Sequence, residues 1–112
     1  MTSSTDRFNR LTEDVDAFAR ARGWQQSHNP KNLLLALVGE VGEVAEVLQW
    51  LTPEECSDLR HPSSPHREPL REELADVLIY LIELAANVDI DLIDAAQDKL
   101  VKNAIKHPAP TR

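Results

Sequence analysis

Two pairs of acidic residues, each spaced at about one helical turn and each set in an apolar segment, constrain this chain most strongly. The first pair is Glu40 and Glu43, and the second is Glu73 and Asp76. Residues three apart are neighbours on the surface of an α-helix, so each pair presents two carboxyl groups side by side. Four such groups in apolar surroundings indicate two helices with a positively charged ligand between them.

The apolar residues around each pair predict where the acids point. When each residue advances about 100° around the helix axis, Glu40 projects with an apolar set and Glu43 lies at its edge. That set comprises Leu33, Ala36, Leu37, Val44, Val47 and Leu51. In the second segment Glu73 projects with another apolar set, with Asp76 at the edge, and its members are Leu70, Val77, Tyr80 and Leu84. We therefore expect the four acids in the core-facing stripes of their helices, away from solvent.

A bound divalent cation is the simplest explanation for these acids. A carboxylate that loses its hydration without compensation is strongly disfavoured or takes up a proton, and converging carboxylates also repel one another. Oxygen ligands without Cys or His favour a hard ion. We predict Mg²⁺, with Mn²⁺ as a possible substitute, and its ligands are Glu40, Glu43, Glu73 and Asp76. A di-iron centre is disfavoured, because such bundles use Glu-x-x-His and the sequence contains none.

Each acidic pair also has a simpler interpretation. Acids three apart often decorate an exposed helix surface, and one isolated pair would favour that reading. Two pairs, both centred in apolar stripes, favour a site instead. An alternative function remains open, namely a helical oligomerisation or regulatory module without catalysis that keeps the acids as a structural cation site.

Length and composition predict a single all-α domain. The chain has 112 residues, with 42% apolar and only 4% aromatic residues. These values suit one helical core. We expect one domain over residues 1–112, of the four-helix bundle type, with flexible tails at 1–5 and 107–112.

The charge balance narrows the partners. The net charge of −7 disfavours nucleic acid or an anionic membrane surface as the main partner, because both carry negative charge. No apolar run is long enough to span a membrane, and the first residues carry no hydrophobic signal region. Cys56 is the only cysteine, which excludes an internal disulfide and suits a reducing compartment. We expect a soluble, cytoplasmic protein.

Capping and breaking residues delimit the expected helices. Thr5 or Asp6 can cap the first helix and Gly23 can end it, whereas Asp89 or Asp91 can cap the last. Thr52 to Glu55 form a capping box for a short helical turn. The long helices are expected at about 6–22, 32–50, 69–87 and from about 90 to 107. The third is apolar on several faces, which predicts that a second subunit covers it in an obligate oligomer.

Two stretches resemble a known family. The segment from Asn32 to Trp50, NLLLALVGEVGEVAEVLQW, and the segment from Glu72 to Leu81, EELADVLIYL, are similar to the MazG-type all-α nucleoside triphosphate pyrophosphohydrolases. Within them the chain most resembles the dCTP pyrophosphatase branch. The resemblance implies Mg²⁺-dependent cleavage of a nucleoside triphosphate, dCTP or a modified dCTP, to the monophosphate and pyrophosphate. It places the metal ligands at the same four acids and implies a homodimer or a tetramer of two dimers.

Further site residues follow from the residues and from the resemblance. Glu43 is the first candidate for the group that takes the proton of the attacking water, and Glu46, which projects away from the stripe, is the second. Lys99 and Asn103 share a helix face and match phosphate-binding positions of the dCTP pyrophosphatase branch. Tyr80 lies one turn past Asp76, and its hydroxyl is expected to donate to a phosphate or to the sugar. Trp24, His28 and Trp50 match base-pocket positions, where rings stack on a nucleobase. Each also has an ordinary structural explanation: a lysine near a helix end, a tryptophan in a core or a solvated loop histidine.

Overall fold

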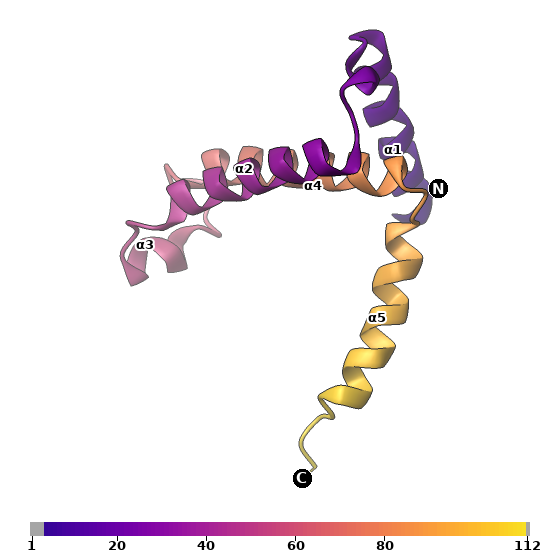
Figure 1. Cartoon of the computed structure of the whole chain (residues 1–112). Coiled ribbons are helices and arrows are strands. Elements are labelled where there is room, and N and C mark those ends of the chain that lie inside the picture. The colour runs from indigo at the N-terminus through magenta and orange to yellow at the C-terminus, as the bar shows by residue number, and fades with distance from the viewer. Residues whose placement is uncertain (1–3, 112) are drawn as a thin grey trace.

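The protein is described by a computed structural model that covers residues 4–111. Every regular element in this range is helical, which confirms the expected all-α class (Figure 1). In chain order the elements are α1 (Ser4–Ala21), the 3₁₀ turn η1 (Trp24–Gln26), α2 (Pro30–Leu48), α3 (Pro53–Asp58), α4 (Arg67–Asn87) and α5 (Leu92–Lys106). No described helix has both the length and the hydropathy of a membrane span.

Helices α2 and α4 form the centre of the fold. They lie side by side along most of their length, and α1 crosses α4 near its C-terminal half (Figure 1). The most buried side chains join these three helices, since Leu33 of α2 and Ile82 of α4 are each only 2% exposed. Val15 and Ala19 of α1 are also buried. The apolar stripe around Glu40 therefore faces α4, as the helical periodicity predicts.

Local capping chemistry sets most of the helix boundaries. Asn29 caps α2 by accepting a hydrogen bond from the Asn32 backbone N–H, and Pro30 occupies the first helical turn. The helix thus begins two residues before the predicted start at Asn32, because proline is well accommodated at this position. The predicted capping box of Thr52 and Glu55 is confirmed, with both reciprocal hydrogen bonds present.

The first helix starts earlier than expected. It already includes Ser4, so the prediction that Thr5 or Asp6 caps it is wrong, and Asp6 lies in its first turn. Gly23 follows the helix in the left-handed conformation, with φ of 68°, which glycine adopts at little cost. Its N–H donates to the Arg20 carbonyl, which confirms the predicted stop.

The boundaries of the last two helices also follow their caps. Helix α4 begins at Arg67, so Pro69 lies inside its first turn, where a missing N–H costs little. Asp91 caps α5 by accepting from the Asp94 N–H, whereas Asp89 adopts a positive φ of 57° in the turn. Of the two predicted caps, Asp91 is the correct one.

Helix α5 projects away from the other helices (Figure 1). It has no buried residue, and Leu100, Val101 and Ile105 are 68%, 64% and 78% exposed. Leu34, Leu35 and Val38 on the outer side of α2 are also exposed. Within one chain only α1, α2 and α4 pack together, so α5 does not complete a four-helix bundle.

Candidate metal centre and adjoining cavity

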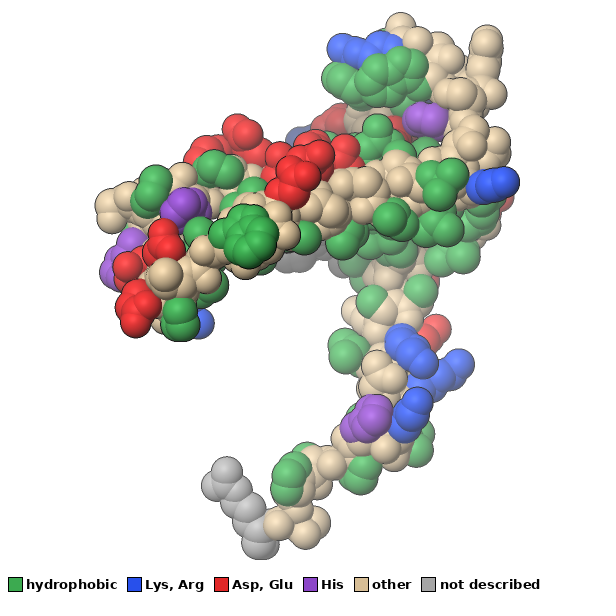
Figure 2. Space-filling view, turned by 60° about the vertical axis from the view of Figure 1, so that its left-hand side comes forward, with side chains coloured by type: hydrophobic (Ala, Val, Ile, Leu, Met, Phe, Trp, Pro, Cys, Tyr) green, Lys and Arg blue, Asp and Glu red, His purple; other side chains and the backbone are tan. Residues whose placement is uncertain are grey.

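Three of the four predicted acids come together between α2 and α4. Glu40, Glu73 and Asp76 each offer a carboxylate oxygen, and these oxygens all lie within 4.8 Å of one another. The arrangement results from the i, i+3 spacing on α4 and from the packing of Glu40 on α2 against that turn. Acidic side chains gather over the two helices in Figure 2.

The acids are less buried than predicted. No polar or charged side chain among those described is fully buried, and Glu40 and Glu73 are partly exposed. The expectation that all four point into the core is therefore wrong. Apolar side chains such as Leu33 fill the seam between the helices, and the carboxylates emerge along its open side, where water or a ligand can reach them.

Glu43 stands slightly apart from the other acids. It is exposed and does not belong to the group within 4.8 Å. The neighbouring Glu46 carboxylate raises the pKa of Glu43 most, and burial, a hydrogen bond with Glu46 and the charge of Glu73 add to the effect. Glu43 therefore lies beside the cluster, and its roles as fourth ligand and proton acceptor stay predictions.

The electrostatics of the cluster match a site built for a cation. Burial raises the pKa of Glu40, and the charges of Asp76 and Glu43 raise it further. Burial likewise raises the pKa of Glu73, followed by the charges of Asp76 and Glu40. The ion pairs within residues 4–111 involve other acids, so no Lys or Arg in this range neutralises the three. An all-oxygen donor set of this kind fits Mg²⁺ or Mn²⁺.

A cavity of about 390 Å³ adjoins the acidic cluster. Glu40 and Asp76 of the cluster line it, together with Tyr80 and the aromatic rings of Phe18 and Trp24. The Phe18 and Trp24 rings meet edge to face, with centroids 5.6 Å apart and an angle of 70° between their planes. Burial raises the pKa of the Tyr80 hydroxyl, and the charges of Glu83, Glu40 and Asp76 add to the effect. Its phenol is therefore protonated and able to donate near neutral pH.

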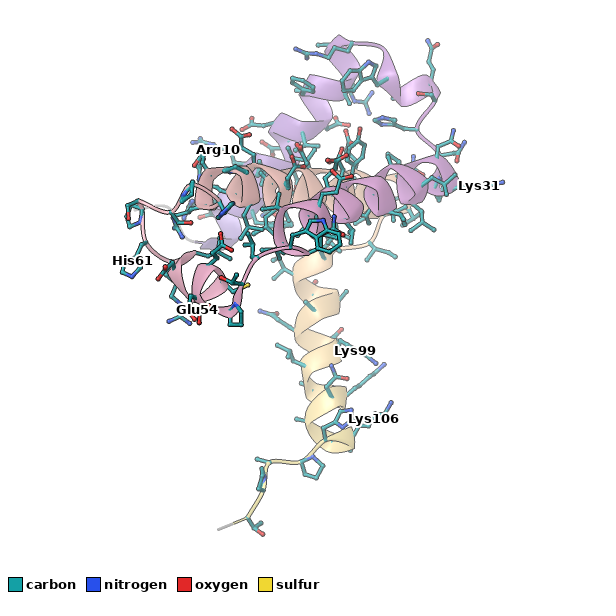
Figure 3. All side chains as sticks on the ribbon, turned by 90° about the vertical axis from the view of Figure 1, so that its left-hand side faces the viewer. Arg10, Lys31, Glu54, His61, Lys99 and Lys106 are labelled. Carbon is teal, nitrogen blue, oxygen red and sulfur yellow. The ribbon has the colours of Figure 1, made fainter. Side chains whose placement is uncertain are left out.

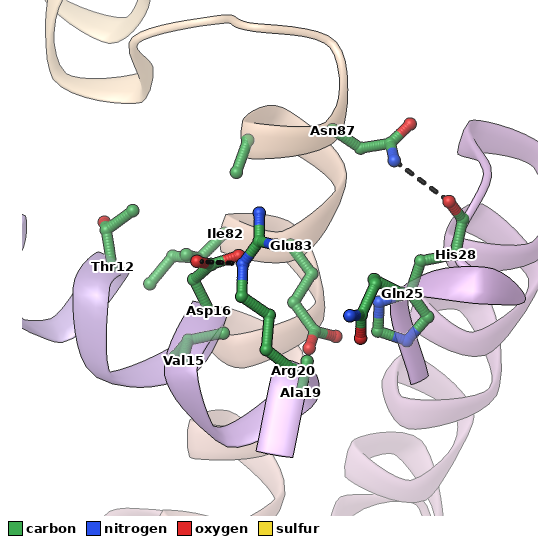
Figure 4. Close-up of a pocket in the computed structure, with 11 residues that line it drawn as sticks. Thr12, Val15, Asp16, Ala19, Arg20, Gln25, His28, Ile82, Glu83 and Asn87 are labelled. Carbon is green, nitrogen blue, oxygen red and sulfur yellow. Dashed lines mark hydrogen bonds and ion pairs between the residues drawn. The ribbon is translucent and has the colours of Figure 1, made fainter. Parts of the chain in front are cut away.

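The other predicted site residues lie elsewhere. His28 lines a neighbouring cavity of about 150 Å³, where its backbone carbonyl accepts a hydrogen bond from Asn87 (Figure 4). Trp50 is 84% exposed at the end of α2. Lys99 and Asn103 are on α5, which projects away from α2 and α4 (Figure 3). A single chain thus brings Trp24 and Tyr80 to the acids, and leaves Trp50, Lys99 and Asn103 apart from the cavity.

Sequence reasoning missed part of this cavity. Phe18 of α1 was not among the predicted site residues, but its side chain is 50% exposed and lines the cavity with Asp14. Glu83 of α4 also lines it. A sequence signal for Glu83 does exist, since it is an acid two turns after Asp76 within an otherwise apolar segment.

The fold and the acidic site together define a class of protein. It is an all-α protein in which two packed helices present carboxylates at metal-ligand separation beside an aromatic cavity. Residues 28–110 match the family model described as the MazG nucleotide pyrophosphohydrolase domain. The chain therefore belongs to the MazG nucleotide pyrophosphohydrolase family, which confirms the resemblance noted from its sequence.

Two further comparisons agree with this membership. The chain is 51% identical over 92 residues to dCTP pyrophosphatase 1 of Homo sapiens and 50% identical over 91 residues to that of Mus musculus. These matches cover 82% and 81% of the chain but 54% and 53% of the relatives, so the chain spans about half of their length. The crystal structure of a pyrophosphatase from Archaeoglobus fulgidus superposes with a TM-score of 0.81 at 35% identity, covering 92% of this chain and 94% of that chain.

Proposed function

We propose that this protein is a Mg²⁺-dependent nucleoside triphosphate pyrophosphohydrolase. Its substrate is a deoxynucleoside triphosphate, dCTP or a modified dCTP, and its products are the monophosphate and pyrophosphate. The observation that carries the proposal is the convergence of Glu40, Glu73 and Asp76 beside an aromatic cavity. The similarity to proteins named dCTP pyrophosphatase 1 supports the choice of base.

Glu40, Glu73 and Asp76 would hold the metal, with Glu43 as the fourth ligand. A divalent cation held by these residues would supply positive charge to neutralise the triphosphate and would make a water molecule more acidic. The protein contributes mainly positioning and electrostatics, as in other phosphoryl transfers. Glu43 is the proposed acceptor of the water's proton, since it lies beside the cluster and is reachable by solvent.

The rings of Trp24 and Phe18 in the cavity would contact the nucleobase. Trp24 offers a ring face and an indole edge, and Phe18 extends the apolar surface. Tyr80 lines the same cavity as the acids and the two rings, and its hydroxyl would donate to the sugar or to a phosphate oxygen. His28 and Trp50 stay predicted base-pocket residues. Trp50 follows the last residue of α2 by two positions, and its exposed ring would contact a substrate that extends past the cluster.

A second copy of the chain would complete the site. The exposed apolar residues of α5 and the outer side of α2 require cover in water, and a homodimer or a dimer of dimers supplies it. Helix α5 also carries Lys99 and Asn103, which lie away from the acids of their own chain. In the oligomer these two residues would contact phosphates bound to the acids of a neighbouring copy. We place the protein in the cytoplasm, where the exposed thiol of Cys56 stays reduced.

The decisive experiment is pyrophosphate release from a panel of nucleotides in the presence of Mg²⁺. The panel contains dCTP, 5-modified dCTP, dUTP, dTTP and the ribonucleotides. We expect turnover with a preference for cytosine, and loss of turnover in Glu40→Gln and Asp76→Asn with an unchanged helical circular dichroism spectrum. The alternative, a non-catalytic helical module with a structural cation site, predicts Mg²⁺ binding without pyrophosphate release. Persistent activity in both variants would refute the metal assignment.

A further inference from the structure

Glu83 lies in the wall shared by two neighbouring cavities, both of which are lined in part by α1. It lines the cavity that contains Trp24, Glu40 and Asp76, and it also lines the neighbouring one that contains His28. Val15 is the only other described residue common to both, and it is apolar and buried. In Figure 4 the Glu83 side chain reaches from α4 toward Gln25 and His28. The carboxylate is thus the polar group on the partition between the cavities.

The Glu83 carboxylate has no bonded partner within residues 4–111. It makes no ion pair and accepts no hydrogen bond from another side chain or backbone group in that range. Its oxygens are nevertheless not sealed off, since no buried, unpaired polar atom occurs among the described side chains. Burial raises the pKa of Glu83, and the nearby His28 opposes that rise. A partly buried carboxylate without a protein donor, on the wall of an open cavity, is available to accept a hydrogen bond from a ligand.

We propose that Glu83 is a specificity residue that accepts a hydrogen bond from the exocyclic amino group of a nucleobase held against Trp24 and Phe18. The inference rests on the proposed nucleotide substrate and specifies how its base is chosen. Cytosine presents an N4 amino donor, and carboxylates accept from this group in other nucleic-acid complexes. Uracil and thymine present the O4 acceptor at the same position, whose lone pairs oppose those of a carboxylate. Glu83 therefore favours an amino pyrimidine over a keto pyrimidine.

Asp14 is the competing acid in the same cavity. It is on α1, is exposed, and lines the cavity with Phe18. An exposed carboxylate keeps its hydration, so it discriminates weakly between amino and keto pyrimidines. A partly buried carboxylate has lost part of its hydration, so a hydrogen bond from the ligand contributes more to binding. Glu83 also lies on α4, the helix that carries Glu73 and Asp76, so one rigid element holds both the metal ligands and the base reader.

The test compares Glu83→Gln with wild type using dCTP and dUTP at saturating Mg²⁺. We expect the ratio of kcat/KM for dCTP to that for dUTP to fall about 10- to 100-fold, mainly through KM, because the charge-assisted hydrogen bond to N4 becomes a neutral one. The glutamine amide can donate to O4, so activity with dUTP rises. Glu13→Gln, an exposed acid on α1 outside both cavities, serves as the matched control and leaves the ratio unchanged.

Binding of the product nucleotides separates this inference from the proposed function. Affinities for dCMP and dUMP are measured by calorimetry on wild type, Glu83→Gln and Asp14→Asn, with thermal unfolding as a check of folding. A preference for dCMP that disappears only in Glu83→Gln supports the inference even when no pyrophosphate is released from any triphosphate. Turnover of dCTP with an unchanged base preference in Glu83→Gln, or a preference lost only in Asp14→Asn, overturns it and leaves the proposed function standing.

Discussion

Sharing of one site between two copies predicts that two inactive variants restore each other. The first variant is Glu40→Gln, which disables the acidic cluster. The second is Lys99→Ala combined with Asn103→Ala, which removes the polar groups of α5. Because α5 projects from its own chain, a working site would take its acids from one copy and its α5 from a neighbour. An oligomer that contains both variants then includes some sites with no defect.

The size of the rescue follows from this geometry. In an equal, random mixture half of the copies carry intact acids, and half of their neighbours carry an intact α5. About one quarter of the sites in the whole mixture are therefore complete. Purification that keeps only mixed oligomers raises this share to about one half for a dimer, so activity should reach about one quarter to one half of wild type. If acids and α5 acted within one chain, every copy would carry a defect and no rescue would occur.

The assay is pyrophosphate release from dCTP by the two variants coexpressed with different affinity tags and purified through both. Each variant expressed alone gives the background. The matched control is a mixture of Glu40→Gln with Asp76→Asn, whose defects lie in the same half of the site, so that mixture stays inactive. A coexpressed pair that is no more active than the control would refute the shared site, provided that size-exclusion chromatography shows mixed oligomers.

Three further predictions follow. Leu33→Ala removes a side chain that is 2% exposed between α2 and α4, so the free energy of unfolding measured in urea should fall by about 2–5 kcal/mol; a loss below about 1 kcal/mol would contradict the central role of this seam. The pKa values of Glu40 and Glu73 are raised above their ordinary 4.5, so the folded state binds more protons than the unfolded state. Without metal, the unfolding free energy of wild type should therefore fall, relative to that of Glu40→Gln, as pH rises through and above 4.5. Added Mg²⁺ should reverse this trend, and calorimetric scans across pH check it; a flat difference would refute the coupling. Ile105→Asp places a charge on a residue that is 78% exposed on α5, and it should shift light-scattering mass toward the monomer, whereas an unchanged mass would exclude α5 from the subunit contact.

Local patterns in the sequence predicted much of this molecule. The apolar stripes around Glu40 and Glu73 have the period of a helix, and that period depends only on backbone geometry, so they identified both central helices and the faces that meet. The capping box at Thr52 and the stop at Gly23 were also predicted, because caps involve residues only a few positions apart. For the same reason the i, i+3 spacing placed each acidic pair on one helix face, whereas the packing of α2 on α4 determined that Glu40, Glu73 and Asp76 lie within 4.8 Å of one another.

Tertiary structure alone decided which of the predicted site residues lie near the acids and which lie apart from them. The crossing of α1 over α4 brings Phe18 and Trp24 to the acids and places Glu83 between two cavities. The turn before Asp91 directs α5 away from its own chain, which separates Lys99 from Glu40. Helical periodicity shows which residues share a face, but it contains no information on the angle between two helices or on the direction of the chain after a turn. Those depend on long-range packing.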